Sequence, residues 1–179
     1  AKVLMWGGKN DEAKRLNDLA TSMVPEDSEA QAQEGILLWR AGDREAAIVR
    51  LREAERLAPW NAVIHHKLGV ILSELNRLNE AQVELEKAIR LDPTMVNVYY
   101  DLGVVLHALG KNKQAESAYR TAMKEDPNHA ETYNNLGIIL GQRGDHKGAS
   151  EMFAKALQLN PDYEFAANNL ARARKAQGL

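Results

Sequence analysis

The sequence predicts an all-α fold, a right-handed α-solenoid of 34-residue helix-turn-helix units closed by a C-terminal capping helix. Two observations carry this prediction: prolines and small residues recur with a step of 34, and the apolar residues between them are spaced three and four apart. Spacings of three and four place side chains on one face of a helix. Each unit is therefore expected to be a pair of helices that buries its apolar face against the next unit.

Several columns of the sequence share this period. Prolines stand at Pro59, Pro93, Pro127 and Pro161, and glycines at Gly35, Gly69, Gly103 and Gly137. The glycine column predicts close approach of the two helices in each pair. A turn between them is indicated by Gly42, Asn76, Gly110 and Gly144, residue types that accept a left-handed backbone. The polar residues after the later prolines, Thr94, Asn128 and Asp162, are expected to cap the following helices.

A helix-turn-helix unit of this length and pattern resembles the tetratricopeptide repeat. Tyr99 and Tyr133 fill the aromatic fourth position of that family. The resemblance implies one solenoid domain with full repeats at 28–61, 62–95, 96–129 and 130–163. Residues 1–27 are then a partial repeat, the end of a first helix plus a second helix, and residues 164–179 are the capping helix.

Composition excludes several classes of protein. The 179 residues carry 23 Lys and Arg against 25 Asp and Glu, so no basic excess is present to bind nucleic acid. There is no cysteine, which excludes disulfides and thiolate metal sites. No apolar run has the length of a membrane span, so direct membrane insertion is not expected. The compartment stays open, with the cytoplasm slightly favoured over the periplasm.

Catalysis and metal binding are not expected from the titratable residues. No two histidines have the i, i+4 spacing of a helical zinc site, and His65 and His66 are adjacent, about 100° apart on a helix. The carboxylates of the second helices, such as Glu55 and Glu84, alternate with Arg and Lys and are expected on a solvated outer face. The sequence thus predicts no cofactor, no metal and no enzyme activity.

The resemblance implies that first helices line a concave groove. Their ninth position holds Ile36, Val70, Val104 and Ile138, an apolar strip that is either the groove floor or ordinary core between neighbouring helices. The candidate binding residues around this strip are Trp39, His66, Lys67, Asn97, Tyr100, Asp101, His107, Asn134, Asn135, Asn168, Asn169 and Arg172. Aromatic anchors bordered by hydrogen-bonding groups are typical of a surface that binds a peptide or a helix.

The leading hypothesis is therefore a noncatalytic protein–protein interaction module, an adaptor or scaffold that holds a peptide or helix of a partner protein. One alternative is a scaffold that self-assembles into a homo-oligomer through its terminal helices. Another is the recruiting arm of a larger enzyme such as a glycosyltransferase. This last alternative depends on the paired asparagines, which resemble in two units the asparagine ladder of O-linked N-acetylglucosamine transferase repeats.

Overall fold

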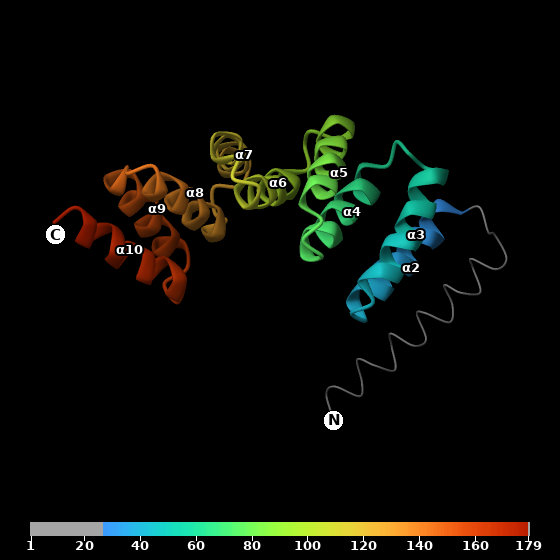
Figure 1. Cartoon of the computed structure of the whole chain (residues 1–179), viewed down its shortest axis with the longest axis horizontal. Coiled ribbons are helices and arrows are strands. Elements are labelled where there is room, and N and C mark those ends of the chain that lie inside the picture. The colour runs from blue at the N-terminus through green and yellow to red at the C-terminus, as the bar shows by residue number, and fades with distance from the viewer. Residues whose placement is uncertain (1–26, 179) are drawn as a thin grey trace, which may run out of the picture. The chain divides into compact units, whose positions relative to one another are not determined.

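The computed structural model describes residues 27–178, which form nine α-helices and no strand (Figure 1). The chain divides into two compact units, Ala1–Pro93 and Thr94–Leu179, referred to below as unit 1 and unit 2. The predicted all-α class is confirmed. None of the described helices combines the length and the apolar character needed to cross a membrane.

The described part of unit 1 consists of two helical hairpins. Its helices are α2 (Ser28–Arg40), α3 (Arg44–Leu57), α4 (Ala62–Glu74) and α5 (Leu78–Leu91). Helix α2 packs along α3, α4 packs along α5, and α4 also contacts α2 and α3. Leu51, Leu68, Leu72 and Leu85 are inaccessible to solvent and form part of the core of this unit.

Unit 2 repeats the arrangement and adds a final helix. Its helices are α6 (Val96–Ala108), α7 (Asn112–Glu125), α8 (Ala130–Gln142), α9 (His146–Leu159) and α10 (Glu164–Ala176). The first helices of successive repeats in unit 2 lie side by side, because α8 contacts both α6 and α10. Tyr119 and Phe153 fill the space inside the two hairpins.

The glycine column is explained by contact with the partner helix. A Cβ atom added at Gly103 would lie 2.5 Å from Tyr119 Cε1, and one added at Gly69 would lie 2.6 Å from Leu85 Cγ. Neither contact is sterically possible without a shift, so a residue without a side chain is needed at both positions. At the turns, Asn76 has φ of 58° and Gly42 has φ of 92°, as the left-handed turn prediction requires.

The predicted helix caps were wrong by one residue. Helices α6, α8 and α10 have Met95, His129 and Tyr163 at the N-cap, and none of these side chains makes a capping hydrogen bond to the helix backbone. In the same column of unit 1, Asp27 and Asn61 do cap α2 and α4. The polar residues after the prolines belong to the preceding turn, where the backbone N–H of Asn128, for example, donates to Asp126. The prediction for residues 1–27 as a partial repeat lies, apart from Asp27, outside the described residues.

Candidate functional site

A chain of side-chain hydrogen bonds crosses the first helices of unit 2. Asn169 of α10 donates to Asn134 Oδ1 of α8 at 3.0 Å, and Asn134 donates to Asn135 Oδ1 at 3.2 Å. Asn135 in turn donates to the hydroxyls of Tyr100 at 3.5 Å and Tyr119 at 3.4 Å. The sequence placed four of these five residues on one surface, and the structure brings them into contact. We call this set the amide–phenol chain.

The amide–phenol chain consumes much of the bonding capacity of its central amides. Asn134 is buried, and both its amide nitrogen and its oxygen have partners within the chain. Asn135 and Asn169 are half-buried; within these bonds Asn169 keeps one N–H and its oxygen, whereas Asn135 keeps only a lone pair on its oxygen. Burial raises the pKa of Tyr100, which keeps its hydroxyl neutral and able to accept a hydrogen bond.

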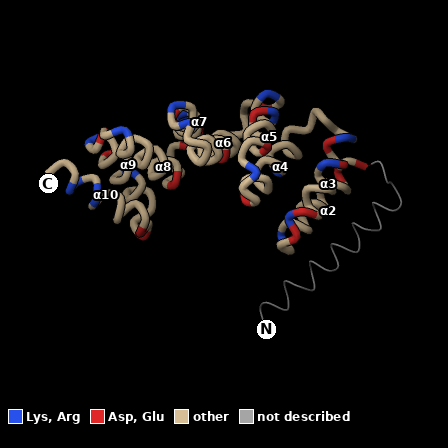
Figure 2. The backbone as a smooth tube through the Cα atoms, in the orientation of Figure 1, with Lys and Arg blue, Asp and Glu red and all other residues tan. Residues whose placement is uncertain are grey.

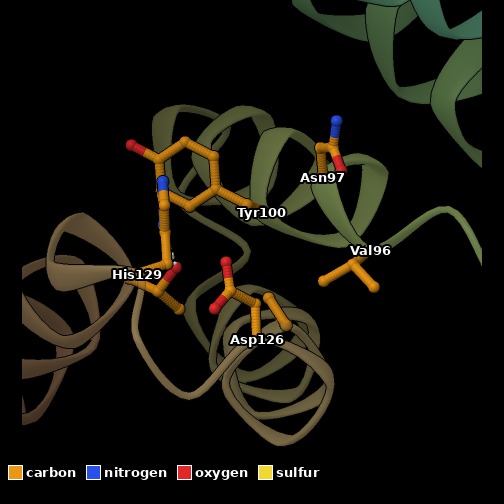
Figure 3. A pocket seen from close by; sticks show the side chains of 7 residues that line it. Val96, Asn97, Tyr100, Asp126 and His129 are labelled. Atoms are coloured by element: carbon orange, nitrogen blue, oxygen red, sulfur yellow. Dashed lines mark hydrogen bonds between the residues drawn. The ribbon is translucent and has the colours of Figure 1, made fainter.

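Two cavities flank this chain. The first has a volume of about 320 Å³ and lies where the end of α7 and the start of α8 meet α6; Asn97, Tyr100 and Asp126 line it (Figure 3). The second has a volume of about 510 Å³ and lies between α8, α9 and α10; Ile138 and Arg172 are among its lining residues. Both are formed entirely by residues of unit 2.

The remaining predicted residues of unit 2 are spread over the same helices. Asp101, Val104 and His107 are half-buried on α6, and Asn168 is exposed on α10. His107 Nε2 lies 3.2 Å from Gln142 Oε1 on α8. The ninth position is half-buried in both units, at Ile36, Val70, Val104 and Ile138. This intermediate exposure fits both interpretations of the strip, as groove floor and as packing between helices.

Two of the predicted residues of unit 1, Trp39 and Lys67, lie together. The indole N–H of Trp39 donates to Glu74 Oε2 at 3.1 Å, and Lys67 Nζ lies 5.7 Å from the centre of the indole ring. Glu74 also pairs with Arg44 Nε at 2.6 Å. These contacts join α2 to α4 and hold Trp39 half-buried. His66, by contrast, is buried in α4 and does not present its ring to solvent.

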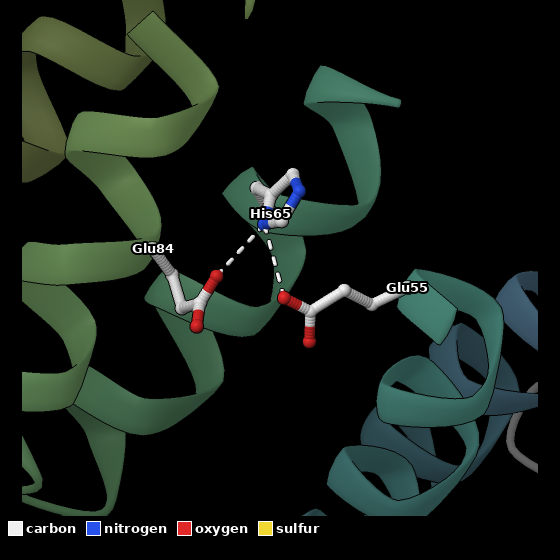
Figure 4. A group of neighbouring side chains, drawn as sticks. All are labelled: Glu55, His65 and Glu84. Atoms are coloured by element: carbon white, nitrogen blue, oxygen red, sulfur yellow. Dashed lines mark hydrogen bonds and ion pairs between the residues drawn. The ribbon is translucent and has the colours of Figure 1, made fainter. Parts of the chain in front are cut away.

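Sequence analysis missed a buried ionic cluster in unit 1, made of Glu55, His65 and Glu84 with Arg52 and Lys87. His65 Nδ1 lies 2.8 Å from Glu84 Oε2 and 3.7 Å from Glu55 Oε1 (Figure 4). Arg52 bonds both carboxylates, at 2.7 Å to Glu55 and 2.6 Å to Glu84, and Lys87 pairs with both as well. The prediction that Glu84 lies on a solvated face was therefore wrong, because its side chain is only 3% exposed.

The geometry of this ionic cluster indicates that His65 is protonated. The second ring nitrogen of His65 lies 3.0 Å from the carbonyl oxygen of Pro59, so both ring nitrogens face acceptors. Only the imidazolium, with two N–H donors, satisfies both. The bond to Glu84 raises the pKa of His65, against the opposing effect of burial. Burial would raise the pKa of Glu84, but the bonds from His65 and Arg52 outweigh it and lower this pKa to about 2.

The same three ligand-type residues lie close enough together to be tested for metal binding, since their ligand atoms are all within 4.8 Å. Two features argue for the proton instead. The 2.8 Å contact of His65 with Glu84 is a direct hydrogen-bond distance. Arg52 and Lys87 already bond the two carboxylates, so a divalent ion would have to bind next to two cations or displace them.

The residues that sequence analysis missed share a physical reason. Asp126, His129 and Thr132 line the first cavity from the end of α7 and the start of α8, whereas the groove count considered first-helix positions only. The cluster around His65 joins three helices, at sequence separations with no helical signature. A signal was present in the column of Tyr99 and Tyr133, where His65 replaces the aromatic residue.

Comparison with known families agrees with this architecture. Profiles described as tetratricopeptide repeat match residues 94–162 and 38–88, and a profile described as TPR repeat matches residues 71–110. These matches span most of the described residues. The chain belongs to the tetratricopeptide repeat family. Members of this family are protein-interaction modules in the general sense.

Solved structures show the same fold. MamA matches with 24% identity and a TM-score of 0.81, covering 88% of this chain and 92% of that one. YrrB, described as a TPR protein with an unusual peptide-binding site, matches with 22% identity and a TM-score of 0.80, covering 93% of this chain and 86% of that one. PilF of Pseudomonas aeruginosa matches with 19% identity and a TM-score of 0.78, covering 94% of this chain and 83% of that one. No curated protein sequence gives a significant match. The fold class is thus an all-α tetratricopeptide solenoid.

Proposed function

We propose that the chain is a noncatalytic adaptor that binds a short segment of a partner protein along the first helices α6, α8 and α10 of unit 2. The observation that carries this proposal is the amide–phenol chain with a cavity on either side. Both amides, Asn135 and Asn169, are half-buried: Asn169 retains an N–H and an oxygen for a peptide backbone, and Asn135 retains a lone pair on its oxygen. The similarity in fold to YrrB, which has a peptide-binding site, also supports it.

The cavities suit side chains of such a segment. With volumes of about 320 and 510 Å³ they lie in the lower half of the range for ligand sites, and each has room for a side chain of the segment. Tyr100 stands between the first cavity and the amide–phenol chain, and half-buried aromatic residues commonly supply most of the energy of an interface. Tyr100 is therefore the anchor of the proposed site.

Selection of a displayed random peptide library on the full chain tests the proposal. Selected peptides are resynthesised, and their affinities for the wild type, Tyr100→Ala and Gln158→Ala are measured by calorimetry. Gln158 is exposed on the second helix α9 and serves as the control. We expect Tyr100→Ala to weaken binding at least about tenfold and Gln158→Ala to leave it unchanged.

Circular dichroism checks that the variants remain folded. Should Tyr100→Ala lose helicity, Asn169→Ala at the other end of the amide–phenol chain replaces it. Peptides that bind all variants equally, or a library that yields no binder, would overturn the proposal.

A further inference from the structure

The cavity beside Tyr100 combines an aromatic ring with a carboxylate, and this pairing is specific to one repeat. Asp126 points from the end of α7 into the space bounded by Tyr100, His129 and Val96 (Figure 3). His129 contacts the Tyr100 ring edge to face, with ring centres 4.7 Å apart. The Tyr100 ring is thereby fixed in position beside the carboxylate.

The carboxylate of Asp126 is available to a ligand. One of its oxygens accepts the backbone N–H of Asn128 at 3.0 Å, and within the described part of the chain it forms no ion pair. A carboxylate at the mouth of a cavity attracts a cation.

The surrounding helices reinforce this charge. Neither α6 nor α8 contains lysine or arginine, and their acidic residues are Asp101 and Glu131 (Figure 2). Both contribute to the raised pKa of Tyr100, behind burial, which places their negative charge near the ring. The two first helices beside the cavity thus contribute acidic groups and no lysine or arginine; on α7, which also lines it, Lys124 is exposed and lies 3.8 Å from Glu125.

We propose that this cavity receives an arginine side chain of the bound segment, with its guanidinium on the face of Tyr100 and paired with Asp126. This inference rests on the proposed function and names one residue of the ligand. A planar guanidinium stacks on an aromatic ring and pairs with a carboxylate at once, which an ammonium does less well. Asn97 and Thr132 supply further polar lining at the cavity wall.

The other repeats lack this combination. The positions of Tyr100 and Asp126 are occupied by His66 and Asp92 one repeat earlier and by Asn134 and Asn160 one repeat later. His66 and Asn134 are both buried. The proposed arginine site is thus a feature of the repeat at 96–129 rather than of the solenoid in general, and it would fix the register of the bound segment.

Nuclear magnetic resonance titration of the full chain tests the inference. The probes are acetyl-Gly-Arg-Gly-amide and the matched peptide with citrulline, which has the shape of arginine without its charge. We expect saturable shifts at the amides of Val96, Asn97 and Thr132, with a dissociation constant on the order of millimolar. The citrulline peptide should bind at least about fivefold more weakly, and higher salt should weaken the arginine peptide.

Two variants of equal charge change separate the site from general electrostatics. Asp126→Asn keeps an oxygen for the Asn128 N–H and should weaken the arginine peptide at least about fivefold. Glu151→Gln removes one charge from the exposed surface of α9 and should have no effect. Equal binding of both peptides, an unchanged Asp126→Asn affinity, or shifts confined to α10 would overturn the inference.

The library peptides distinguish this inference from the proposed function. If they bind in a Tyr100-dependent way but show no enrichment of arginine and no effect of Asp126→Asn, the arginine site is wrong and the peptide-binding function stands. If no library peptide binds while the arginine probe shows the expected pattern, the function fails and the cavity retains its cation selectivity.

Discussion

The region where one helical hairpin meets the next, here called the joint, is built differently in the two units. Two residues at the same repeat position show the difference. His65 of unit 1 and Tyr133 of unit 2 are two repeats apart, and each bonds to the carbonyl oxygen of the preceding proline. The contact is 3.0 Å from His65 Nε2 to Pro59 and 3.0 Å from the Tyr133 hydroxyl to Pro127. The bond to the proline carbonyl is thus common to the two units while the ring differs.

The neighbours of the ring change with it. Around Tyr133 the packing is apolar and includes Met123 and Met152. Two repeats earlier those positions hold Glu55 and Glu84, which flank the imidazole. A buried charge is tolerated only when it is compensated, so an imidazolium at this position requires carboxylates, and these also pair with the partly exposed Arg52 and Lys87. The ring and its two neighbours thus differ together between the units, whereas Arg52 and Lys87 have counterparts of the same type in unit 2, Arg120 and Lys155.

The largest expected effect on stability comes from removing one charged member of the ionic cluster. Glu84→Gln leaves His65, Arg52 and Lys87 with Glu55 as their remaining anion in the ionic cluster. Breaking a buried ion pair on one side is strongly destabilising, and we expect a loss of about 3 kcal/mol in the free energy of unfolding. Urea denaturation followed by circular dichroism measures it.

Glu53→Gln is the matched control for this variant. Glu53 lies on the same helix as Glu55 but pairs with Arg56 at an exposed position. No measurable change is expected there. Equal stability of Glu84→Gln and wild type would show that the ionic cluster contributes nothing to the joint.

The second prediction converts the joint of unit 1 to the type found in unit 2. The triple variant Glu55→Met, His65→Tyr, Glu84→Met replaces the ionic cluster by the apolar set, and Arg52 and Lys87 can turn their half-exposed side chains to water. Replacing a buried ionic cluster by packed apolar residues is commonly neutral or stabilising. We expect stability at pH 6 equal to or above that of the wild type, and the pH dependence of the joint to disappear.

The sign of that pH dependence follows from the shifts in the wild type. The folded-state pKa of His65 is raised, so its stabilisation is complete below the unfolded value of about 6.5 and is lost as pH rises through the folded pKa. The pKa of Glu84 is lowered to about 2, so its stabilisation is present above about 4.5 and lost as pH falls toward 2. Denaturation of wild type and triple variant between pH 5 and 9 checks this. A parallel decline in both proteins would contradict the assignment to His65.

Much of the fold was predictable because the residues that repeat every 34 positions are those that close helix contacts and turn conformations require. Gly103 is needed by contact with Tyr119, and Asn76 by a positive φ, and such requirements recur in every repeat. The burial of Glu84 was not predictable in the same way, because its pattern within α5 is that of an outer face. Its environment is set by α3 and α4, which approach from other parts of the sequence.

Part of the candidate binding surface was also predictable from the sequence. Counting first-helix positions found Tyr100, Asn135 and Asn169, which the structure joins by hydrogen bonds. Their role in binding stays a prediction. The count did not find Asp126, because it considered first helices only, and the end of α7 comes to lie beside the start of α6 through the pairing of the two helices in their hairpin.

The smallest expected effect comes from removing the bond to the proline carbonyl, the one feature that the two joints share. Tyr133→Phe keeps the ring among Met123 and Met152 and removes only the hydroxyl bond to Pro127. A neutral hydrogen bond contributes about 1 kcal/mol, so we expect the free energy of unfolding to fall by about that amount, without pH dependence between pH 5 and 9. Chemical denaturation at both pH values measures it. A loss of this size makes the bond to the proline carbonyl a common stabilising element of both joints. An unchanged stability would contradict that, and the role of His65 would then be ionic alone.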